Sequence, residues 1–208
     1  MILIGQYDSS FVRRVGIALS LYEIPFEHRP WSVFGDAEKI AAYNPLTRVP
    51  TLVLDDWDVL VDSYTILDHL DSLVSADRAM HPRSGPERRQ SLRVTALASG
   101  LADKAVSLFY ERRLHDISSP VWEERCLRQL RGTLAALEAD RAGRDGPYWF
   151  GERIGHGDIA AAASIRHMTD SHPELAGLEE YPALTAHCRA MEAMAVFRLI
   201  SQPFIPPT

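Results

Sequence analysis

Two adjacent hydroxyl side chains, Ser9 and Ser10, stand near the start of the 208-residue chain, just after Tyr7. They follow the apolar run Ile2–Ile4, which reads as a buried strand, and they precede a helical pattern. A hydroxyl at the start of a helix can cap it, which is worth about 1 kcal/mol. It can also donate a hydrogen bond to a sulfur atom held there, where unpaired N–H groups favour the thiolate over the thiol. The two serines are therefore candidates either for capping the helix or for activating a thiol.

A second group of chemically capable residues lies on either side of the segment around residue 55. Arg48, Val49 and Pro50 precede an apolar run, and Asp62 and Ser63 stand where the next apolar run gives way to a helix. The simplest readings are a surface arginine, an ordinary proline at a strand start and a serine that caps the helix. A carboxylate and a hydroxyl at a helix N-terminus could also bind a charged ligand group.

Apolar periodicity predicts the elements that position these residues. One helix face carries Phe11, Val15, Ala18, Leu19 and Tyr22. The further expected elements are an extended segment from Pro25 to Trp31, a short helix over 36–42, hairpin strands over 51–54 and 59–61, and a helix after Ser63. The order βαβ, short helix, ββα predicts a mixed sheet flanked by helices.

The second part of the chain shows no strand alternation. After a Pro- and Gly-bearing stretch, five helices are expected over 87–115, 120–142, 156–171, 182–191 and 193–201. We therefore expect an N-terminal domain over 1–78, a linker over 79–86 and an all-helical domain over 87–208.

The composition indicates a globular protein, with 46% hydrophobic and 24% charged residues. A net charge of -6 argues against a nucleic-acid partner. The first residues do not read as a signal peptide and no apolar run is long enough for a membrane span, so we expect a cytoplasmic protein. Cys126 and Cys188 lack CxxC or metal-ligand spacing, and we expect reduced thiols and no metal.

Four segments in this order resemble the cytosolic glutathione transferases: Tyr7–Val15, Asn44–Leu52, Asp62–Ile66 and Gly155–Ala160. The first is similar to the serine-containing helix start of bacterial and zeta- or theta-like members. The next two look like the glutathione-site block, and the fourth resembles the opening of the central helix of the second domain. The resemblance covers nearly the whole chain. It implies an α/β thioredoxin-like N-terminal domain, an all-α helical-bundle C-terminal domain and glutathione as co-substrate.

The resemblance also implies roles for the serines. Ser9 takes the place of the catalytic serine, and Ser10 stands where many bacterial members have proline. Because this leaves two adjacent hydroxyls, Ser10 stays a second candidate. Tyr7 is a third, since other classes use a tyrosine at the end of the first strand.

Glutathione-binding residues follow from the same resemblance. It implies a cis bond between Val49 and Pro50, which turns the Val49 N–H and C=O outward so that glutathione pairs as an extra strand. Asp62 and Ser63 would bind the γ-glutamyl end, with Asp62 standing where most members have Glu. Arg48 could pair with the glycyl carboxylate.

The electrophile would bind between the domains, against the first helix of the bundle. Our candidates there are Phe11, Trp31, Phe109, Tyr110 and Arg113, although a Phe–Tyr pair on a helix is also typical of a core. In the second domain, Asp158 has the acidic place of a capping box whose cap, Gly155, lacks a hydroxyl. We therefore assign Asp158 a structural role.

The resulting hypothesis is a homodimeric glutathione transferase that acts on a small hydrophobic electrophile, as in detoxification. A non-catalytic glutathione- or ligand-binding or regulatory protein of the same fold is one alternative. A glutathione-dependent isomerase or dehalogenase is another, because it would use the same groups.

Overall fold

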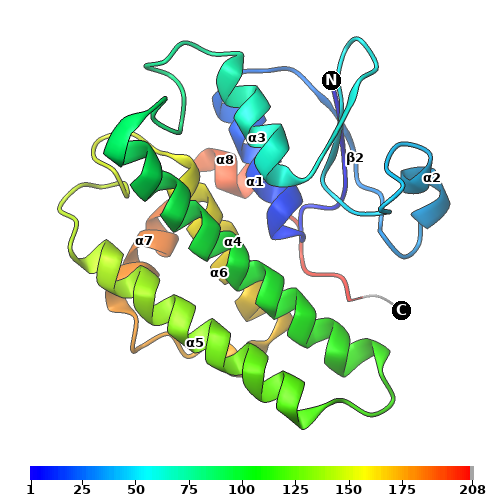
Figure 1. Ribbon diagram of the computed structural model, residues 1–208, viewed down its shortest axis with the longest axis vertical. Helices are drawn as coiled ribbons and strands as arrows, with labels where there is room; N and C mark the ends of the chain where they lie inside the picture. The colour runs from blue at the N-terminus through cyan, green and yellow to red at the C-terminus, as the bar shows by residue number, and fades with distance from the viewer. Residues whose placement is uncertain (207–208) are drawn as a thin grey trace. The chain divides into compact units, whose positions relative to one another are not determined.

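The computed structural model describes residues 1–206 and forms two compact units (Figure 1). The first consists of Met1–Arg83 together with the segment from Met194 onward, and the second is Ser84–Ala193. The sequence predicts that residues 87–208 form the helical domain together. The C-terminal segment instead packs with the first unit, because Arg13 of that unit binds two of its carbonyl groups.

The first unit contains a four-stranded mixed sheet, as predicted. Its elements are β1 (Ile2–Ile4), α1 (Ser10–Leu21), β2 (Glu27–Arg29), α2 (Ala37–Ala41), β3 (Thr51–Val53), β4 (Val59–Val61), α3 (Ser63–Ser72) and α8 (Ala195–Leu199). The strand order is β2-β1-β3-β4. Strand β1 runs parallel to β2 and antiparallel to β3, and β3 and β4 form the expected antiparallel hairpin.

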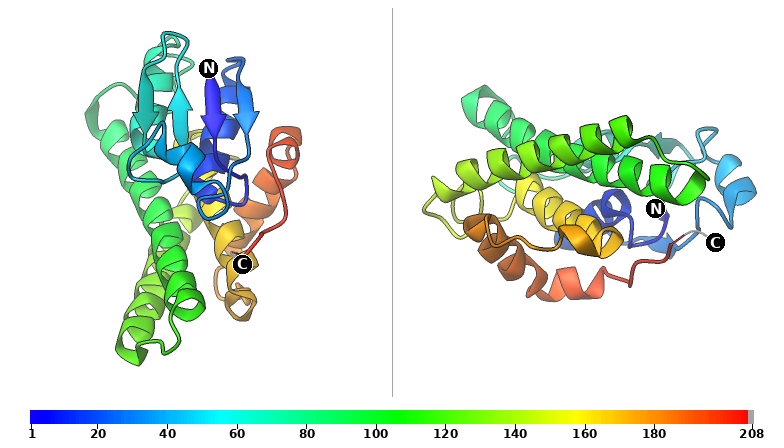
Figure 2. Two further views of the ribbon diagram at one scale, coloured as in Figure 1. Left: turned by 90° about the vertical axis from the view of Figure 1, so that its right-hand side faces the viewer. Right: turned by 90° about the horizontal axis from the view of Figure 1, so that it is seen from below.

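The two faces of this sheet are covered by different helices of the unit (Figure 2). Leu3 and Leu52 are paired across β1 and β3, and Leu3 points toward Gly16 of α1. Ile4 and Val53 point to the other face, where they form an apolar cluster with Ile40 of α2. This is the alternation expected of a sheet that is buried on both faces.

The second unit is all helical, as predicted. It contains α4 (Gly85–Leu114), α5 (Pro120–Ala142), α6 (His156–Ser171), the short 3₁₀ helix η1 (Pro173–Leu175) and α7 (Pro182–Glu192). Helices α4 and α5 are long neighbours (Figure 1), and α4 also packs against α6. The run Ala160–Ala163 is buried in α6, and small side chains allow such close helix packing. The η1 turn was not predicted, and α8 is shorter than the expected 193–201.

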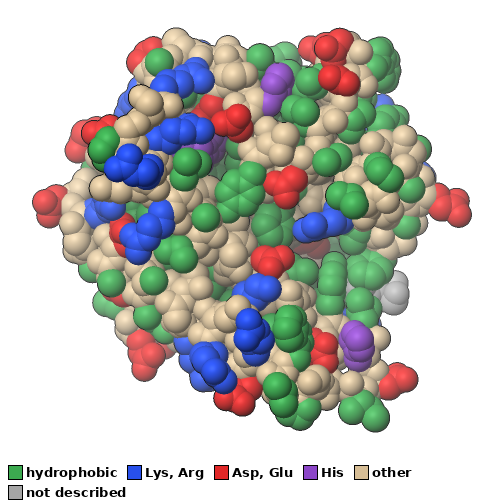
Figure 3. All heavy atoms as spheres, in the orientation of Figure 1, with side chains coloured by type: hydrophobic (Ala, Val, Ile, Leu, Met, Phe, Trp, Pro, Cys, Tyr) green, Lys and Arg blue, Asp and Glu red, His purple; other side chains and the backbone are tan. Residues whose placement is uncertain are grey.

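Acidic and basic side chains are interspersed on the face shown in Figure 3, with apolar side chains scattered among them. Within residues 1–206, no helix has the length and apolar character that a membrane crossing requires.

Asp158 is fully buried at the start of α6, where its carboxylate binds two backbone groups. It accepts hydrogen bonds from the N–H groups of Gly155 and Trp149, both at 2.7 Å. The Nε2 atom of His187 lies 3.1 Å from Oδ1 of Asp158 but forms no hydrogen bond within residues 1–206. Nε of Arg141 donates to Nδ1 of the same imidazole at 3.2 Å. Gly155 itself contributes no side-chain cap, so only the acidic half of the capping box exists.

We expect Asp158→Ala to lower the free energy of unfolding by about 3 kcal/mol, since it leaves two backbone donors without an acceptor. Urea denaturation measures this, and Asp116→Ala, at an exposed aspartate, is the matched control. The folded variant should keep the ligand affinity of the wild type. A loss of affinity at unchanged stability would contradict the structural role.

Candidate functional site

The turn before α1 presents Ser9. The Ser9 N–H donates to the carbonyl of Gln6 at 3.2 Å, which closes a turn over residues 6–9. Ser9 is the N-cap of α1, and its Oγ accepts from the Val12 N–H at 3.5 Å. In this contact the hydroxyl acts only as an acceptor. Its O–H can therefore donate to a group bound at the helix N-terminus.

Ser10 has a different environment. Its side chain is 3% exposed, and its Oγ makes no hydrogen bond within residues 1–206. This hydroxyl is enclosed by the first unit, whereas Ser9 is half-buried. Of the two adjacent serines, Ser9 is the one that a dissolved thiol can reach.

Tyr7 is held by stacking. Its ring lies 3.9 Å from the ring of His28, at an interplanar angle of 12°. Nε2 of His28 donates to the carbonyl of Gly5 at 2.8 Å, which fixes the imidazole. Burial raises the pKa of Tyr7 to about 12, so its phenol stays protonated at neutral pH.

Asn44 shapes the loop that carries Arg48, Val49 and Pro50. It is buried, and its Nδ2 donates to the carbonyl of Arg48 at 2.9 Å and to Oγ1 of Thr51 at 3.1 Å. The pair Asn44-Pro45 was expected to end the short helix over 36–42 and to begin the glutathione-site block, and the role of the Asn44 side chain in the loop was not predicted. The available signal was chemical: an asparagine before a proline can hydrogen-bond the backbone of its own loop.

Val49 lies against the end of β1. A Cβ atom on Gly5 would stand 2.7 Å from Cβ of Val49 and 2.5 Å from a methyl of Val12. Gly5 also has φ +128, so only glycine lets the loop come this close. The bond between Val49 and Pro50 is cis. The backbone of Val49 forms no hydrogen bond to another residue in the part of the chain that the structure describes, which leaves it available to an extended ligand.

Asp62 and Ser63 begin α3, but with roles that differ from those expected. Asp62 is the N-cap, because its Oδ1 accepts from the Tyr64 N–H at 2.8 Å. Its φ of 69 is unusual outside glycine, and aspartate tolerates such values better than most residues. The expectation that Ser63 caps this helix was therefore wrong. Ser63 is buried, and its Oγ accepts from Nη2 of Arg14 at 2.6 Å.

Arg14 places a positive charge beneath the start of α3. It is 2% exposed, and its guanidinium lies 4.4 Å from the centre of the Tyr64 ring. Desolvation by burial lowers the pKa of Arg14 to about 10, which still leaves it charged at neutral pH. A role for Arg14 was not predicted. The sequence did contain a sign of its burial, because apolar residues flank it in the helix on the N-terminal and C-terminal sides.

The proposed electrophile residues divide between the two units. Trp31 packs against the Ile4 cluster and tilts against Tyr43, while Phe11 is half-buried in the first turn of α1. On α4 of the second unit, Phe109 and Tyr110 are half-buried with ring centres 6.2 Å apart, and Arg113 is exposed. The structure brings this aromatic pair together, and the electrophile site itself stays a prediction.

A family model for the glutathione S-transferase N-terminal domain matches residues 3–78, and one for the C-terminal domain matches residues 120–190. The chain belongs to the cytosolic glutathione transferase family. The serine-type subclass stays a prediction. No cluster of His, Cys, Asp or Glu within residues 1–206 is arranged to hold a metal ion.

Several relatives of this transferase family member are informative. The uncharacterized GST-like protein YibF of Escherichia coli is 34% identical over 103 residues, a match that spans half of each chain. A glutathione S-transferase from Methylobacterium radiotolerans, solved with glutathione sulfonate, is 27% identical with a TM-score of 0.89 and covers 100% of this chain and 98% of its own. Another from Methylobacillus flagellatus, solved with glutathione, is 25% identical with a TM-score of 0.88 and coverages of 96% and 98%.

The bond between Arg14 and Ser63 predicts a stability effect in the absence of any ligand. Ser63→Ala should lower the free energy of unfolding by about 1–3 kcal/mol, because a buried charged donor loses its acceptor. Ser63→Thr, which keeps the hydroxyl, is the matched control. Denaturant unfolding without glutathione measures both, and equal stability of Ser63→Ala and wild type would disprove the coupling.

The Tyr7 environment predicts a contribution to alkaline instability. The pKa of Tyr7 rises from 10.0 to about 12 in the folded state, so the unfolded chain releases this proton first. The stability of the wild type should therefore decline as the pH rises between these two values. Tyr7→Phe should decline less over the same range. Parallel stability curves for the two proteins, measured by thermal unfolding, would contradict this.

Proposed function

We propose that this family member is an active glutathione transferase in which Ser9 stabilises the thiolate of bound glutathione. The observation that carries the proposal is the contrast between neighbouring hydroxyls. Ser9 stands at the N-terminus of α1 with an O–H able to donate, whereas the hydroxyl of Ser10 is enclosed. A donated hydrogen bond and the helix N-terminus both favour the charged form of a nearby thiol.

The loop and α3 would hold the rest of the tripeptide. The backbone of Val49 pairs with the extended cysteinyl part, as a short added strand. The backbone N–H of Ser63 meets the γ-glutamyl carboxylate, with the Ser63 hydroxyl and the charge of Arg14 behind it, and Asp62 accepts from the amino group. Arg48 is exposed and reaches the glycyl carboxylate.

In this proposal the protein has two tasks. It positions the sulfur of glutathione, and it keeps the sulfur ionised at neutral pH, with the thiol proton released to solvent. The thiolate attacks an electrophilic carbon, forms a C–S bond and displaces a leaving group or adds to an activated alkene. The proposed second substrate is a small hydrophobic electrophile, and Phe11, Trp31, Phe109, Tyr110 and Arg113 are the candidates for contacting it. We further infer a cytoplasmic homodimer with a role in detoxification.

Ser9→Ala tests the role of the hydroxyl, with Ser10→Ala as the matched control. We expect Ser9→Ala to bind glutathione with similar affinity but to raise the pKa of the bound thiol by about 1–2 units. The kcat at neutral pH should fall about 10- to 100-fold. Calorimetry gives the affinity, and thiolate absorbance against pH gives the pKa. Ser10→Ala should match the wild type in both measurements.

Two results would redirect the assignment. A wild type that binds glutathione without lowering its thiol pKa would indicate a non-catalytic binding protein of the same fold. If the wild type fails to bind glutathione, the glutathione site is wrong, and only the fold and family remain. Transfer is separated from isomerase or dehalogenase activity by assaying substrates of each class with the same variants.

A further inference from the structure

The segment after α8 is hydrogen-bonded to the turn that presents Ser9. The Tyr7 N–H donates to Oε1 of Gln202 at 2.9 Å, across 195 positions of sequence. The N–H of Ile205 donates to Oδ2 of Asp8 at 3.0 Å. Tyr7 and Asp8 are the two central residues of the turn over 6–9. Both therefore have a partner in the same distant segment, residues 200–205, which we call the C-terminal strap.

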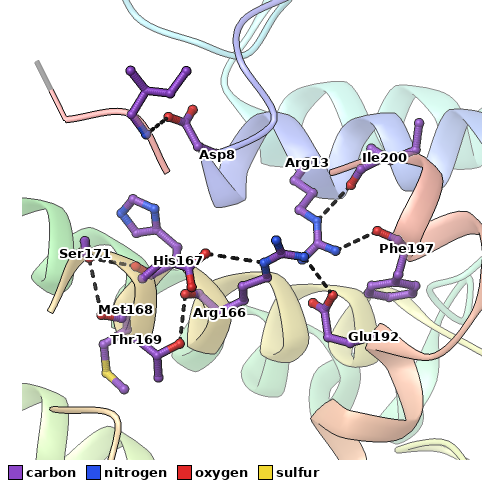
Figure 4. Close-up of polar contacts among 12 residues, drawn as sticks. Asp8, Arg13, Arg166, His167, Met168, Thr169, Ser171, Glu192, Phe197 and Ile200 are labelled. Atoms are coloured by element: carbon purple, nitrogen blue, oxygen red, sulfur yellow. Dashed lines mark hydrogen bonds and ion pairs between the residues drawn. The ribbon is translucent and has the colours of Figure 1, made fainter. Parts of the chain in front are cut away.

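Arg13 anchors the beginning of the strap to α1. Figure 4 shows its guanidinium between the backbone carbonyls of Phe197 and Ile200. Nη2 donates to the Phe197 carbonyl at 2.8 Å and Nε to the Ile200 carbonyl at 2.9 Å. Arg13 is 3% exposed and also lies 5.5 Å from the centre of the Phe197 ring. Charge-assisted hydrogen bonds in a buried setting make this a firm attachment.

Gly16 makes room for the strap. A Cβ atom at this position would stand 2.9 Å from Cγ2 of Ile200 and 2.9 Å from Cε1 of Tyr7. The strap and the Tyr7 ring therefore occupy adjoining space on α1 that a side chain at position 16 would fill. The absence of a side chain at Gly16 therefore allows the strap to lie close to the turn.

Besides the strap, the stacking of Tyr7 on His28 and local hydrogen bonds contribute to the shape of the turn. The closing bond, from the Ser9 N–H to the Gln6 carbonyl, is long at 3.2 Å, and the capping bond of Ser9 is longer still at 3.5 Å. Weak local bonds leave the direction of a hydroxyl poorly set, and small misplacements of a reacting group reduce rates strongly. An anchor on each central residue restricts the backbone immediately before Ser9.

We propose that Gln202 is a positioning residue for thiol activation: by holding the Tyr7 N–H, the C-terminal strap aims the Ser9 hydroxyl at the sulfur. This inference rests on the proposed function of Ser9. It separates orientation of the hydroxyl from binding of the tripeptide, because Val49, Asp62 and Ser63 make no contact with the strap among the hydrogen bonds of the described residues.

The test removes the acceptor and leaves an apolar side chain of similar size. Gln202→Leu should lower kcat about tenfold and raise the pKa of the bound thiol, with KM for glutathione nearly unchanged. Gln202→Glu replaces the amide oxygen with a carboxylate oxygen that can also accept from the Tyr7 N–H, so it should keep most of the wild-type rate. Gln90→Leu makes the same change at an exposed glutamine of α4 and should behave as the wild type.

Asp8→Ala provides a second route, because it removes the other anchor and should change the thiol pKa in the same direction. It also gives the answer if Gln202→Leu does not fold. The inference would be overturned if both variants keep the thiol pKa and the kcat of the wild type, whether or not their melting temperatures fall. Either result would leave the role of Ser9 intact. Absence of glutathione binding by the wild type would instead overturn the proposed function and this inference with it.

Discussion

Helix α1 is buried from Val12 to Leu19, and this burial forces its two adjacent arginines to find partners inside the protein. A buried guanidinium without acceptors is strongly unfavourable, so each of these side chains needs an acceptor within the protein. Arg13 donates to carbonyls that lead into the C-terminal strap, and Nη2 of Arg14 donates to the hydroxyl of Ser63. One structural requirement therefore fastens both the strap and the start of α3 to the helix that Ser9 caps.

The proposed ligand would meet a local field that differs from that of the whole molecule. The chain carries a net charge of -6, yet Arg14 lies in low dielectric directly behind Ser63. A buried charge in this position interacts strongly with a nearby anion, and salt screens that interaction little. In the proposed site, binding of the γ-glutamyl carboxylate would depend on one buried cation and on a helix N-terminus. The overall charge balance matters less.

The elements and the order of the candidate residues could be predicted from the sequence, because strands and helices follow local apolar periodicity. The hairpin around residues 55–58 and the helix capped by Ser9 are examples. The partners could not be predicted. Neighbouring arginines read as surface residues, and nothing near Ser63 or Gln202 in the sequence points to Arg14 or Tyr7. Those contacts join residues 49 and 195 positions apart, and only packing determines them.

The strap also sets an order of events during synthesis. Residues 1–83 contain the whole sheet, α1 and α3, so the first unit can begin to fold while later residues are still being added. The turn before Ser9 gains its two distant anchors only after Gln202 and Ile205 have left the ribosome. In a nascent or prematurely terminated chain the sheet could thus be folded while the Ser9 hydroxyl is not yet oriented by the strap. The finished site would appear only in chains that have been translated through the strap.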